Sequence, residues 1–418
     1  MSDESRPATP DGAPRRKAKV ARKRTVGRVI LISAVVLALV TGLGVVYLVR
    51  HLNGNITSQS LEALGEGRPE KIFKGNGEPL NILVMGSDTR EGAGNEIDGE
   101  GGGGSDTTIL VHLSADRTRA YAISIPRDSI VERPECGSSP ADTDVMWNAA
   151  FTVGGPVCTV DQLETLTDVF VDHYAVIDFN GFGQMVDAVG GVPVCVPEDL
   201  VDKKRDIFVP AGDPSVLTGD EALDYVRARY VGELIQQNDI SRIKRQQTFI
   251  AALVREVKSA GTLTRLDRVV NFLDAATKSL ETDDELDSVV RIGKIALQLQ
   301  NIGLDKVKFV TLPTDYFPSD SPFRGKVRWT QEAETIWQLI NEDKPLPKRV
   351  LNGSISAEPP ATSSEGTEPT EPTDPGTATP PETPTDTASP SETPSETPSE
   401  TPETTAPEPK EQIPGICA

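Results

Sequence analysis

An uninterrupted apolar stretch near the N-terminus restricts this chain more than any other feature. Residues Val29 to Val49 contain no charged side chain in 21 positions, which is long enough for a helix to cross the hydrocarbon core of a bilayer. A secretory signal peptide is the competing interpretation, but its apolar region would be shorter and would end at a small-residue cleavage site. We therefore expect residues 29–49 to be a retained transmembrane helix.

The residues before this stretch indicate how the chain is oriented. Eight Lys and Arg residues lie between Arg15 and Arg28, and such residues stay on the cytoplasmic side of a membrane. Residues 1–28 are therefore expected to be a basic cytoplasmic segment, and everything after Arg50 is expected to be extracytoplasmic. Because topology explains the basic residues, they do not indicate a nucleic-acid partner.

The C-terminal residues 349–418 are expected to be disordered. They are rich in Pro, Thr, Ser and Glu, and they repeat as SETPSETPSETPET. Such a composition cannot bury enough apolar surface to offset the entropy lost on ordering. Residues 351–418 carry thirteen acids and one base, a net charge of −12 in a chain of −21. An inert spacer is the default interpretation; the alternatives are a segment that crosses a charged cell wall and a glycosylated stalk.

The middle of the chain is expected to fold as one large α/β domain over residues 79–348, joined to the membrane by a linker at 50–78. A length of about 270 residues suits a single domain. The strands expected at 81–85, 108–113 and 120–125 have short connections, which favours antiparallel or mixed neighbours over a series of βαβ units. A long helix is expected from Asp239 to Ser259.

Four cysteines allow three complete pairings, and the sequence alone does not select one. The favoured disulfide joins Cys136 and Cys158, which flank one loop-rich segment. Cys195, in VPVCVP, is equally compatible with a buried free thiol, and Cys417 lies in the tail. The spacings match no zinc motif.

Three of the expected strands have polar residues at an end, where α/β proteins place their chemistry. Asp88 and Arg90 follow the first strand, Asp106 begins the second, and Arg127 follows the third. The glycine-rich segment after Arg90 is neither a Walker loop nor a dinucleotide fingerprint, because no GKS or GKT follows and the next element is a strand. The alternative is that Asp88 and Asp106 only cap turns.

A basic cluster lies between Arg227 and Arg245. Ile243, Ile250 and Val257 recur at helical spacing and should face a core. Polar groups on or beside that face need partners, and arginine is suited to bidentate contact with phosphate. An anion site is favoured over a solvated surface for four arginines, whereas Lys244 is expected to be solvated. These four are Arg227, Arg229, Arg242 and Arg245, with Asp239 and Gln246 placed among them. Arg227 and Arg229 share a face in a strand and diverge in a helix.

Two carboxylates at strand ends together with several arginines suit a phosphorylated substrate and a hard cation. Mg²⁺ takes oxygen ligands, commonly one or two carboxylates with phosphate and water. Arginines would hold the remaining phosphate oxygens and stabilise charge as a P–O bond breaks. The residues alone therefore indicate phosphate or pyrophosphate chemistry outside a membrane.

The motifs also resemble those of the LytR-CpsA-Psr family. The resemblance rests on NILVMGSDTR, SDTTILVHL, SIPRDS, VDAVGGVPVCVPEDL and ALDYVRARY followed by NDISRIKRQQ, in this order behind one N-terminal anchor. It implies a three-layer α-β-α fold with a mixed central sheet. It also implies a membrane-anchored, Mg²⁺-dependent phosphotransferase that moves a glycopolymer from a polyprenyl-pyrophosphate carrier to peptidoglycan through a phosphodiester bond, with pyrophosphatase activity as a side reaction. The alternative is a non-catalytic extracytoplasmic binder or sensor of such lipid-linked glycans.

The same resemblance assigns roles to single residues. It implies that Asp88 and Asp106 hold Mg²⁺. It implies that four arginines bind the pyrophosphate, namely Arg90, Arg127, Arg227 and Arg229. The family's D-x-x-R-x-x-R-Q segment corresponds to Asp239, Arg242, Arg245 and Gln246, expected to bind substrate. The general base is open between Asp239 and Asp88. Gly104 is a departure, because the family often has an arginine two residues before the second aspartate.

Overall fold

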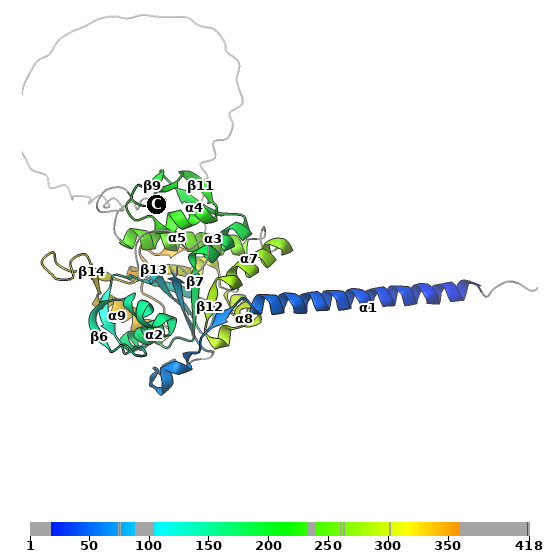
Figure 1. The fold of residues 1–418 in the computed structure, drawn as a ribbon, viewed down its shortest axis with the longest axis horizontal. Coiled ribbons are helices and arrows are strands. Elements are labelled where there is room, and N and C mark those ends of the chain that lie inside the picture. Colours follow the sequence, from blue (N-terminus) through cyan, green and yellow to red (C-terminus); the bar gives the residue numbers. More distant parts are fainter. Residues whose placement is uncertain are drawn as a thin grey trace, which may run out of the picture. The chain divides into compact units, whose positions relative to one another are not determined.

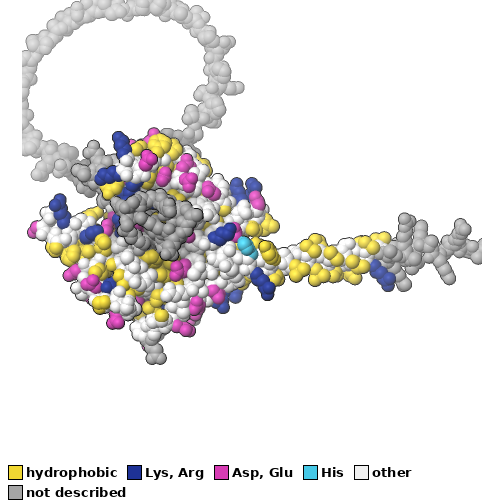
Figure 2. Space-filling model, viewed as in Figure 1, with side chains coloured by type: hydrophobic (Ala, Val, Ile, Leu, Met, Phe, Trp, Pro, Cys, Tyr) yellow, Lys and Arg dark blue, Asp and Glu magenta, His cyan; other side chains and the backbone are white. Residues whose placement is uncertain are grey.

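The structure is a computed structural model. It describes residues 18–358 apart from 74, 76, 88–103, 232–238, 260, 262–263 and 301, and it also describes residue 416. Helix α1 (Ala18–Asn53) contains the expected membrane span. Within the described part of the chain, Val26–Asn53 is the one candidate span by length and composition. Its apolar side chains are exposed, as Figure 2 shows in yellow along the helix, which is the surface that a bilayer covers.

A mixed eight-stranded sheet forms the centre of the folded domain, in the order β1-β12-β7-β2-β3-β4-β13-β16. Strand β3 pairs antiparallel with both β2 and β4, while β2–β7 and β4–β13 are parallel pairs. The mixed sheet expected from the short connections is thereby confirmed. The strands are β1 (Thr57–Ser58), β2 (Leu80–Ser87), β3 (Ser105–Leu113), β4 (Ala120–Ile125), β7 (His173–Asp178), β12 (Leu280–Thr282), β13 (Val307–Thr311) and β16 (Ile355–Ser356).

Helices cover both faces of this sheet, because successive strand residues alternate between two apolar cores. Leu110 faces the core that contains α2 (Ala149–Thr167) and α9 (Gln331–Asn341). Its neighbour Ile109 faces the other core, which contains Ala251 of α5 (Asp239–Lys258). Figure 1 shows α2 and α9 on one side of the sheet and α3 and α5 on the other. The three-layer α-β-α architecture is therefore confirmed.

Smaller elements surround the edge of the sheet that carries the polar residues. The strand pairs β8–β11 and β9–β10 pack with α4 and α5 around a further apolar core, separate from the two that cover the faces of the central sheet. The remaining helices are α3 (Phe179–Val189), α4 (Gly219–Arg227), α7 (Leu266–Lys278), α8 (Val289–Gln300) and α10 (Lys348–Leu351), with short 3₁₀ turns at Leu61–Gly67, Asp284–Leu286 and Leu304–Lys306. The remaining strands are β5 (Ile130–Arg133), β6 (Asp142–Met146), β8 (Val192–Val196), β9 (Leu200–Asp202), β10 (Ile207–Val209), β11 (Gly212–Leu217), β14 (Thr314–Tyr316) and β15 (Val327–Trp329).

Parts of the two flanking segments also join the domain. In the segment expected to be a linker, β1 pairs with β12, and Leu61 packs into the apolar core that contains α2 and α9. After residue 348, α10 and β16 pack against the domain, and β16 pairs with β13. Residues 359–415, which make up most of the predicted tail, lie outside the described residues.

Disulfides confirm one cysteine prediction and correct another. Cys136 and Cys158 are joined across a sequence separation of 22 residues, and this bridge ties the segment that follows β5 to helix α2. Gly155 has φ 67° and Pro156 follows it, so α2 is kinked at this point. Cys195 is also disulfide-bonded, so the alternative of a free thiol is wrong. Cys417 lies outside the described residues.

Candidate functional site

The polar residues predicted at the strand ends meet because of the strand pairing. Strand β3 begins where its antiparallel neighbour β4 ends, with Thr108 opposite Ile125. Asp106 at the start of β3 and Arg127 just after β4 therefore lie at the same edge of the sheet. Helix α5 crosses this edge and begins there at Asp239.

Asp106 is the centre of an arginine cluster at this edge. Its carboxylate is paired with Arg127 through Oδ1 and with Arg229 through Oδ2, the latter at 3.1 Å. Arg242 Nη2 lies 3.4 Å from the backbone carbonyl of Asp106. Arg242 also pairs with Asp239, whose Oδ1 is 3.7 Å from Arg127 Nε. Three guanidinium groups therefore surround two carboxylates, which leaves an excess of positive charge.

The excess of arginines over carboxylates shifts the pKa values of the groups in the cluster. Burial alone raises the pKa of Asp106, but the charges of Arg242, Arg127 and Arg229 outweigh it and lower the pKa below its ordinary value. Burial, together with Arg242 and Arg127, lowers the pKa of Arg229 to about 10. Both groups are thus charged at neutral pH, and Arg229 is held in an environment that favours an additional anion.

Unsatisfied donors indicate where such an anion would bind. The Nε atoms of Arg127, Arg229 and Arg242 are buried and have no hydrogen-bond partner among the described residues. A buried N–H without an acceptor is costly, and in a native protein it calls for an explanation such as a bound ion or a catalytic role. Phosphate oxygens are acceptors that match the guanidinium geometry, so the cluster is suited to bind a phosphorylated group.

Arg227 and Arg229 have different surroundings because the chain changes conformation between them. Helix α4 ends at Arg227, and Ala228 adopts a non-helical conformation. Arg229 then points to Asp106, whereas Arg227 lies with its Cζ 5.1 Å from the ring centroid of Phe179 and lines a cavity. Both of these arginines face the site, as does Arg242.

Residues of the D-x-x-R-x-x-R-Q segment divide between the site and its support. Gln246 lines the cavity, and its Nε2 donates to the Val226 carbonyl at 3.4 Å. Arg245 is fully buried, donates to the Ala228 carbonyl and is not among the residues that line the cavity. Burial lowers its pKa to about 10. Arg245 thus holds the Arg227–Arg229 segment against α5. Lys244 is half-buried, and its Nζ donates to the Gly353 carbonyl at 2.6 Å.

Two residues that the sequence did not single out complete the cluster. Asp202 is fully buried, and its carboxylate accepts hydrogen bonds from the backbone N–H groups of Arg229 at 2.9 Å and Tyr230 at 3.0 Å. Arg205, in the turn between β9 and β10, lines the cavity and donates to the Arg227 carbonyl at 3.3 Å. The basic turn KKR was a usable signal for Arg205, whereas nothing local marked Asp202.

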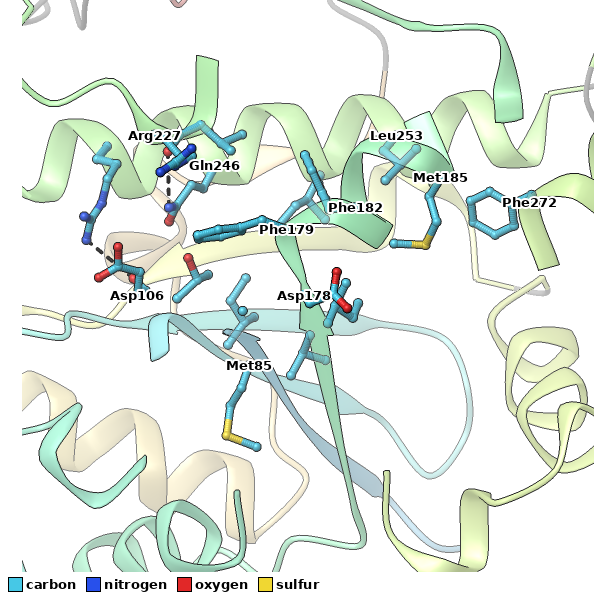
Figure 3. A pocket seen from close by; sticks show the side chains of 18 of the residues that line it. Met85, Asp106, Asp178, Phe179, Phe182, Met185, Arg227, Gln246, Leu253 and Phe272 are labelled. Atoms are coloured by element: carbon cyan, nitrogen blue, oxygen red, sulfur yellow. Dashed lines mark hydrogen bonds between the residues drawn. The ribbon is translucent and has the colours of Figure 1, made fainter. Parts of the chain in front are cut away.

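A largely apolar cavity of about 300 Å³ extends from the cluster between the sheet and helices α3, α5 and α7. Asp106, Arg227 and Gln246 lie at one end (Figure 3), while Met185, Leu253 and Phe272 line the other. Residues on the apolar faces of α3 and α5 thus line this cavity. The cavity can hold a ligand with a charged head and a long apolar tail.

Asp88 and Arg90 lie outside the described residues. Gly104 is described, and a Cβ added there would lie 3.5 Å from Thr152 Oγ1, an ordinary contact. No group of three or more His, Cys, Asp or Glu side chains suited to a metal is present among the described residues. Of the predicted carboxylate pair, Asp106 is the member that the structure describes.

Comparisons with known proteins identify a family and relatives that work on the bacterial cell wall. A sequence profile of the LytR_cpsA_psr family matches residues 47–344. The chain is 31% identical over 316 residues to the cell wall biosynthesis protein LcpA of Corynebacterium glutamicum, covering 68% of this chain and 59% of LcpA. It therefore spans little more than half the length of LcpA. It is 28% identical over 330 residues to the polyisoprenyl-teichoic acid–peptidoglycan teichoic acid transferase TagV of Bacillus subtilis, covering 74% of this chain and 78% of TagV.

The fold is also similar to a solved structure, a LytR-Csp2A-Psr enzyme from Actinomyces oris. The TM-score is 0.50 at 18% sequence identity, over 66% of this chain and 96% of that chain. At this identity the similarity concerns the fold alone.

Proposed function

The chain belongs to the LytR-CpsA-Psr family, and on that premise we propose that it is a membrane-anchored phosphotransferase. It would transfer a glycopolymer from a polyprenyl-pyrophosphate carrier to peptidoglycan and form a phosphodiester link. Helix α1 would keep the enzyme at the membrane, with its N-terminus in the cytoplasm and the folded domain outside. The names of LcpA and TagV, which concern cell wall biosynthesis and transfer to peptidoglycan, support this class of reaction.

One observation carries the proposal, namely that an apolar cavity ends at an arginine cluster. The carrier combines a hydrocarbon tail with a diphosphate, and an apolar cavity lets the part of the tail next to the diphosphate leave the bilayer without contact with water, which would cost about 0.8 kcal/mol per CH₂ group. Arg127, Arg229 and Arg242 carry the unpartnered Nε donors at the charged end. A soluble sugar phosphate would use the arginines and leave the cavity without an occupant of matching chemistry.

The arginines would act on the diphosphate during transfer. An acceptor hydroxyl attacks the phosphorus nearest the sugar, its O–P bond forms, and the P–O bond to the polyprenyl phosphate breaks. The hydroxyl proton passes to a base, and polyprenyl phosphate leaves. Arg127, Arg229 and Arg242 would stabilise the negative charge on the phosphate oxygens in the transition state. Without an acceptor, water would take its place and the same site would act as a pyrophosphatase.

A hard cation fits the oxygen atoms at this site. Asp106 is paired with two arginines, but a carboxylate has about four lone-pair positions, so each oxygen retains one. Asp239 Oδ2 has no hydrogen-bond partner among the described residues. We propose that Asp106, together with Asp88, holds Mg²⁺, which when bound would supply further charge neutralisation at the diphosphate.

A lipid-pyrophosphate binder without turnover is the second candidate, and Gly104 is the observation that favours it. Where many family members have an arginine, Gly104 contributes no charge, and this weakens transition-state stabilisation more than it weakens apolar binding. A binder would hold the donor tightly and release no product.

The test uses the full chain in detergent with a polyprenyl-pyrophosphate-linked sugar and Mg²⁺, with and without glycan strands of peptidoglycan. The wild type is expected to form a sugar-phosphate-peptidoglycan product, to stop when EDTA is added and to resume when Mg²⁺ is restored. Asp106→Ala and Arg229→Ala should each lower turnover by about 10²–10³-fold, the usual effect of removing one transition-state contact. Arg265→Ala is the matched control, since Arg265 is 57% exposed and is not among the residues that line the cavity.

Tight donor binding with neither transfer nor hydrolysis would reject the phosphotransferase and leave the binder.

A further inference from the structure

The hairpin β14–β15 lies beside the arginine cluster because of the parallel pairing of two strands. Strands β4 and β13 are parallel, with Thr311 opposite Ser124, so their carboxyl ends lie at the same edge of the sheet. From that edge β4 continues into Arg127 and Asp128, and β13 continues into the hairpin. The two segments are joined, because Lys326 Nζ lies 2.8 Å from Asp128 Oδ1 and the Val327 N–H donates to the Asp128 carbonyl at 3.2 Å.

Contacts place this hairpin on the side of the cluster opposite the apolar cavity. Asp106 and Arg242 line the cavity, whereas Arg127 and Asp239 contact those two residues and do not line it. Partial burial, followed by the charges of Asp239 and Asp128, raises the pKa of the Tyr316 phenol, so this residue of β14 lies on the side of the cluster that carries those two carboxylates. Figure 1 agrees, since α7, which carries Phe272 at the apolar end, and β14 lie on opposite sides of α5. The arginine cluster therefore lies between the apolar cavity and the β14–β15 hairpin.

Tyr316 presents an aromatic surface at this position. Its side chain is 53% exposed, although partial burial, followed by Asp239 and Asp128, raises the pKa of its phenol. The phenol therefore keeps its proton at neutral pH and can donate a hydrogen bond. Two further aromatic rings stiffen the hairpin, since Phe317 and Phe323 pack at 5.2 Å and the Arg328 guanidinium lies 5.8 Å from the Phe317 ring.

This combination suits one class of ligand. A sugar ring has an apolar C–H face and a rim of hydroxyl groups, and tyrosine has an apolar ring and a polar tip. Carboxylates beside such a ring accept hydrogen bonds from hydroxyl groups. In the transfer reaction the acceptor hydroxyl must approach the phosphorus from outside the apolar cavity, because the lipid leaving group occupies it.

We propose that the β14–β15 hairpin forms the acceptor subsite, with the Tyr316 ring as the platform on which a sugar of the peptidoglycan glycan strand stacks. The proposal rests on the transferase function and adds to it the place where the acceptor binds. Donor binding and donor hydrolysis do not require this surface, so the two ideas can be tested apart.

The experiment compares Tyr316→Ala, Tyr316→Phe and the wild-type full chain in detergent, with the lipid-linked donor and with glycan strands as acceptor. Tyr316→Ala is expected to raise the acceptor KM about tenfold, the effect of losing one aromatic contact, while donor hydrolysis without acceptor changes by less than twofold. Tyr316→Phe keeps the ring and should stay within about threefold of wild type. Phe208→Ala is the matched control, since Phe208 is 56% exposed on β10.

A titration of glycan strands in the absence of donor makes the result independent of transfer. If Tyr316→Ala binds glycan strands about tenfold more weakly than wild type and Phe208→Ala do, the result supports the subsite. If the wild type forms no product, that result rejects the transferase and leaves the binding comparison as the test of the subsite. Equal acceptor binding and equal acceptor KM in Tyr316→Ala and wild type would overturn the subsite.

Discussion

Replacement of Asp202 by asparagine tests how the arginine cluster is held in place. The buried Asp202 carboxylate accepts three backbone N–H groups. Oδ2 accepts from Arg229 at 2.9 Å and from Tyr230 at 3.0 Å, and Oδ1 accepts from Lys204 at 3.1 Å. Asparagine has the same shape, but one of its two polar ends is an NH₂ group. Asp202→Asn therefore leaves at least one of these backbone N–H groups facing another donor.

The expected destabilisation follows from those three bonds. One unsatisfied buried donor costs about 1–3 kcal/mol, and the remaining bonds lose the strength that a charged acceptor gives, about 1 kcal/mol. We expect Asp202→Asn to lower the free energy of unfolding by about 2–4 kcal/mol, against a typical total of about 5–15 kcal/mol. The protein should remain folded, with a Tm lower by about 5 °C.

Activity should fall further than stability explains, because the same bonds fix the backbone of Arg229. A misplacement of about 1 Å can lower a rate by about 10²-fold, so we expect kcat for donor turnover to fall by about 10–100-fold in protein that is fully folded at the assay temperature. The assay combines a thermal melt with donor hydrolysis. Asp199→Asn is the control, since Asp199 is exposed and its Oδ1 accepts one backbone N–H, that of Ala211 at 2.8 Å.

A lower Tm with unchanged kcat would show that Asp202 stabilises the fold without positioning Arg229. An unchanged Tm would refute the hydrogen-bond argument itself.

Two further predictions follow from the same cluster. Gly104→Arg should restore a positive charge at the site, since its Cβ meets only an ordinary contact with Thr152 Oγ1; we expect the donor KM to fall a few-fold with little change in Tm, and an unchanged or higher KM would contradict this. The lowered pKa of Asp106 means that its ionised form stabilises the fold above the unfolded-state value near ~4 and that this contribution is lost as the pH falls through the folded-state value. Acid unfolding should therefore show a shallower loss of stability below pH ~4 in Asp106→Asn than in wild type, and identical curves would argue against the charge pairing.

Local patterns in the sequence were sufficient to predict the main helices and strands. The uncharged stretch 29–49 predicted α1, and the spacing of Ile243, Ile250 and Val257 predicted the helix that the structure places at Asp239–Lys258. These predictions succeed because a helix or strand is specified by residues within a few positions of one another. Short connections between strands likewise indicated a mixed sheet, since a parallel pair requires a long crossover.

The sequence predicted an arginine-rich site, but not which of those arginines would contact Asp106. Arg242 and Arg245 are three positions apart on one helix, yet Arg242 reaches the site while Arg245 is enclosed and holds the Ala228 carbonyl. The difference depends on which segments pack against α5. Helical spacing gives a direction for a side chain, but it does not identify the atoms in that direction.

Tertiary structure alone decided the arrangement of cavity, phosphate contacts and exposed aromatic ring. Arg229 and Asp106 are 123 positions apart, and Asp202 is recognisable only once its carboxylate is seen to hold the backbone of Arg229. Tyr316 reaches the same edge because β13 and β4 pair in parallel. Such contacts join residues that share no local pattern, so their identity depends on the packing of the whole sheet rather than on any stretch of the chain.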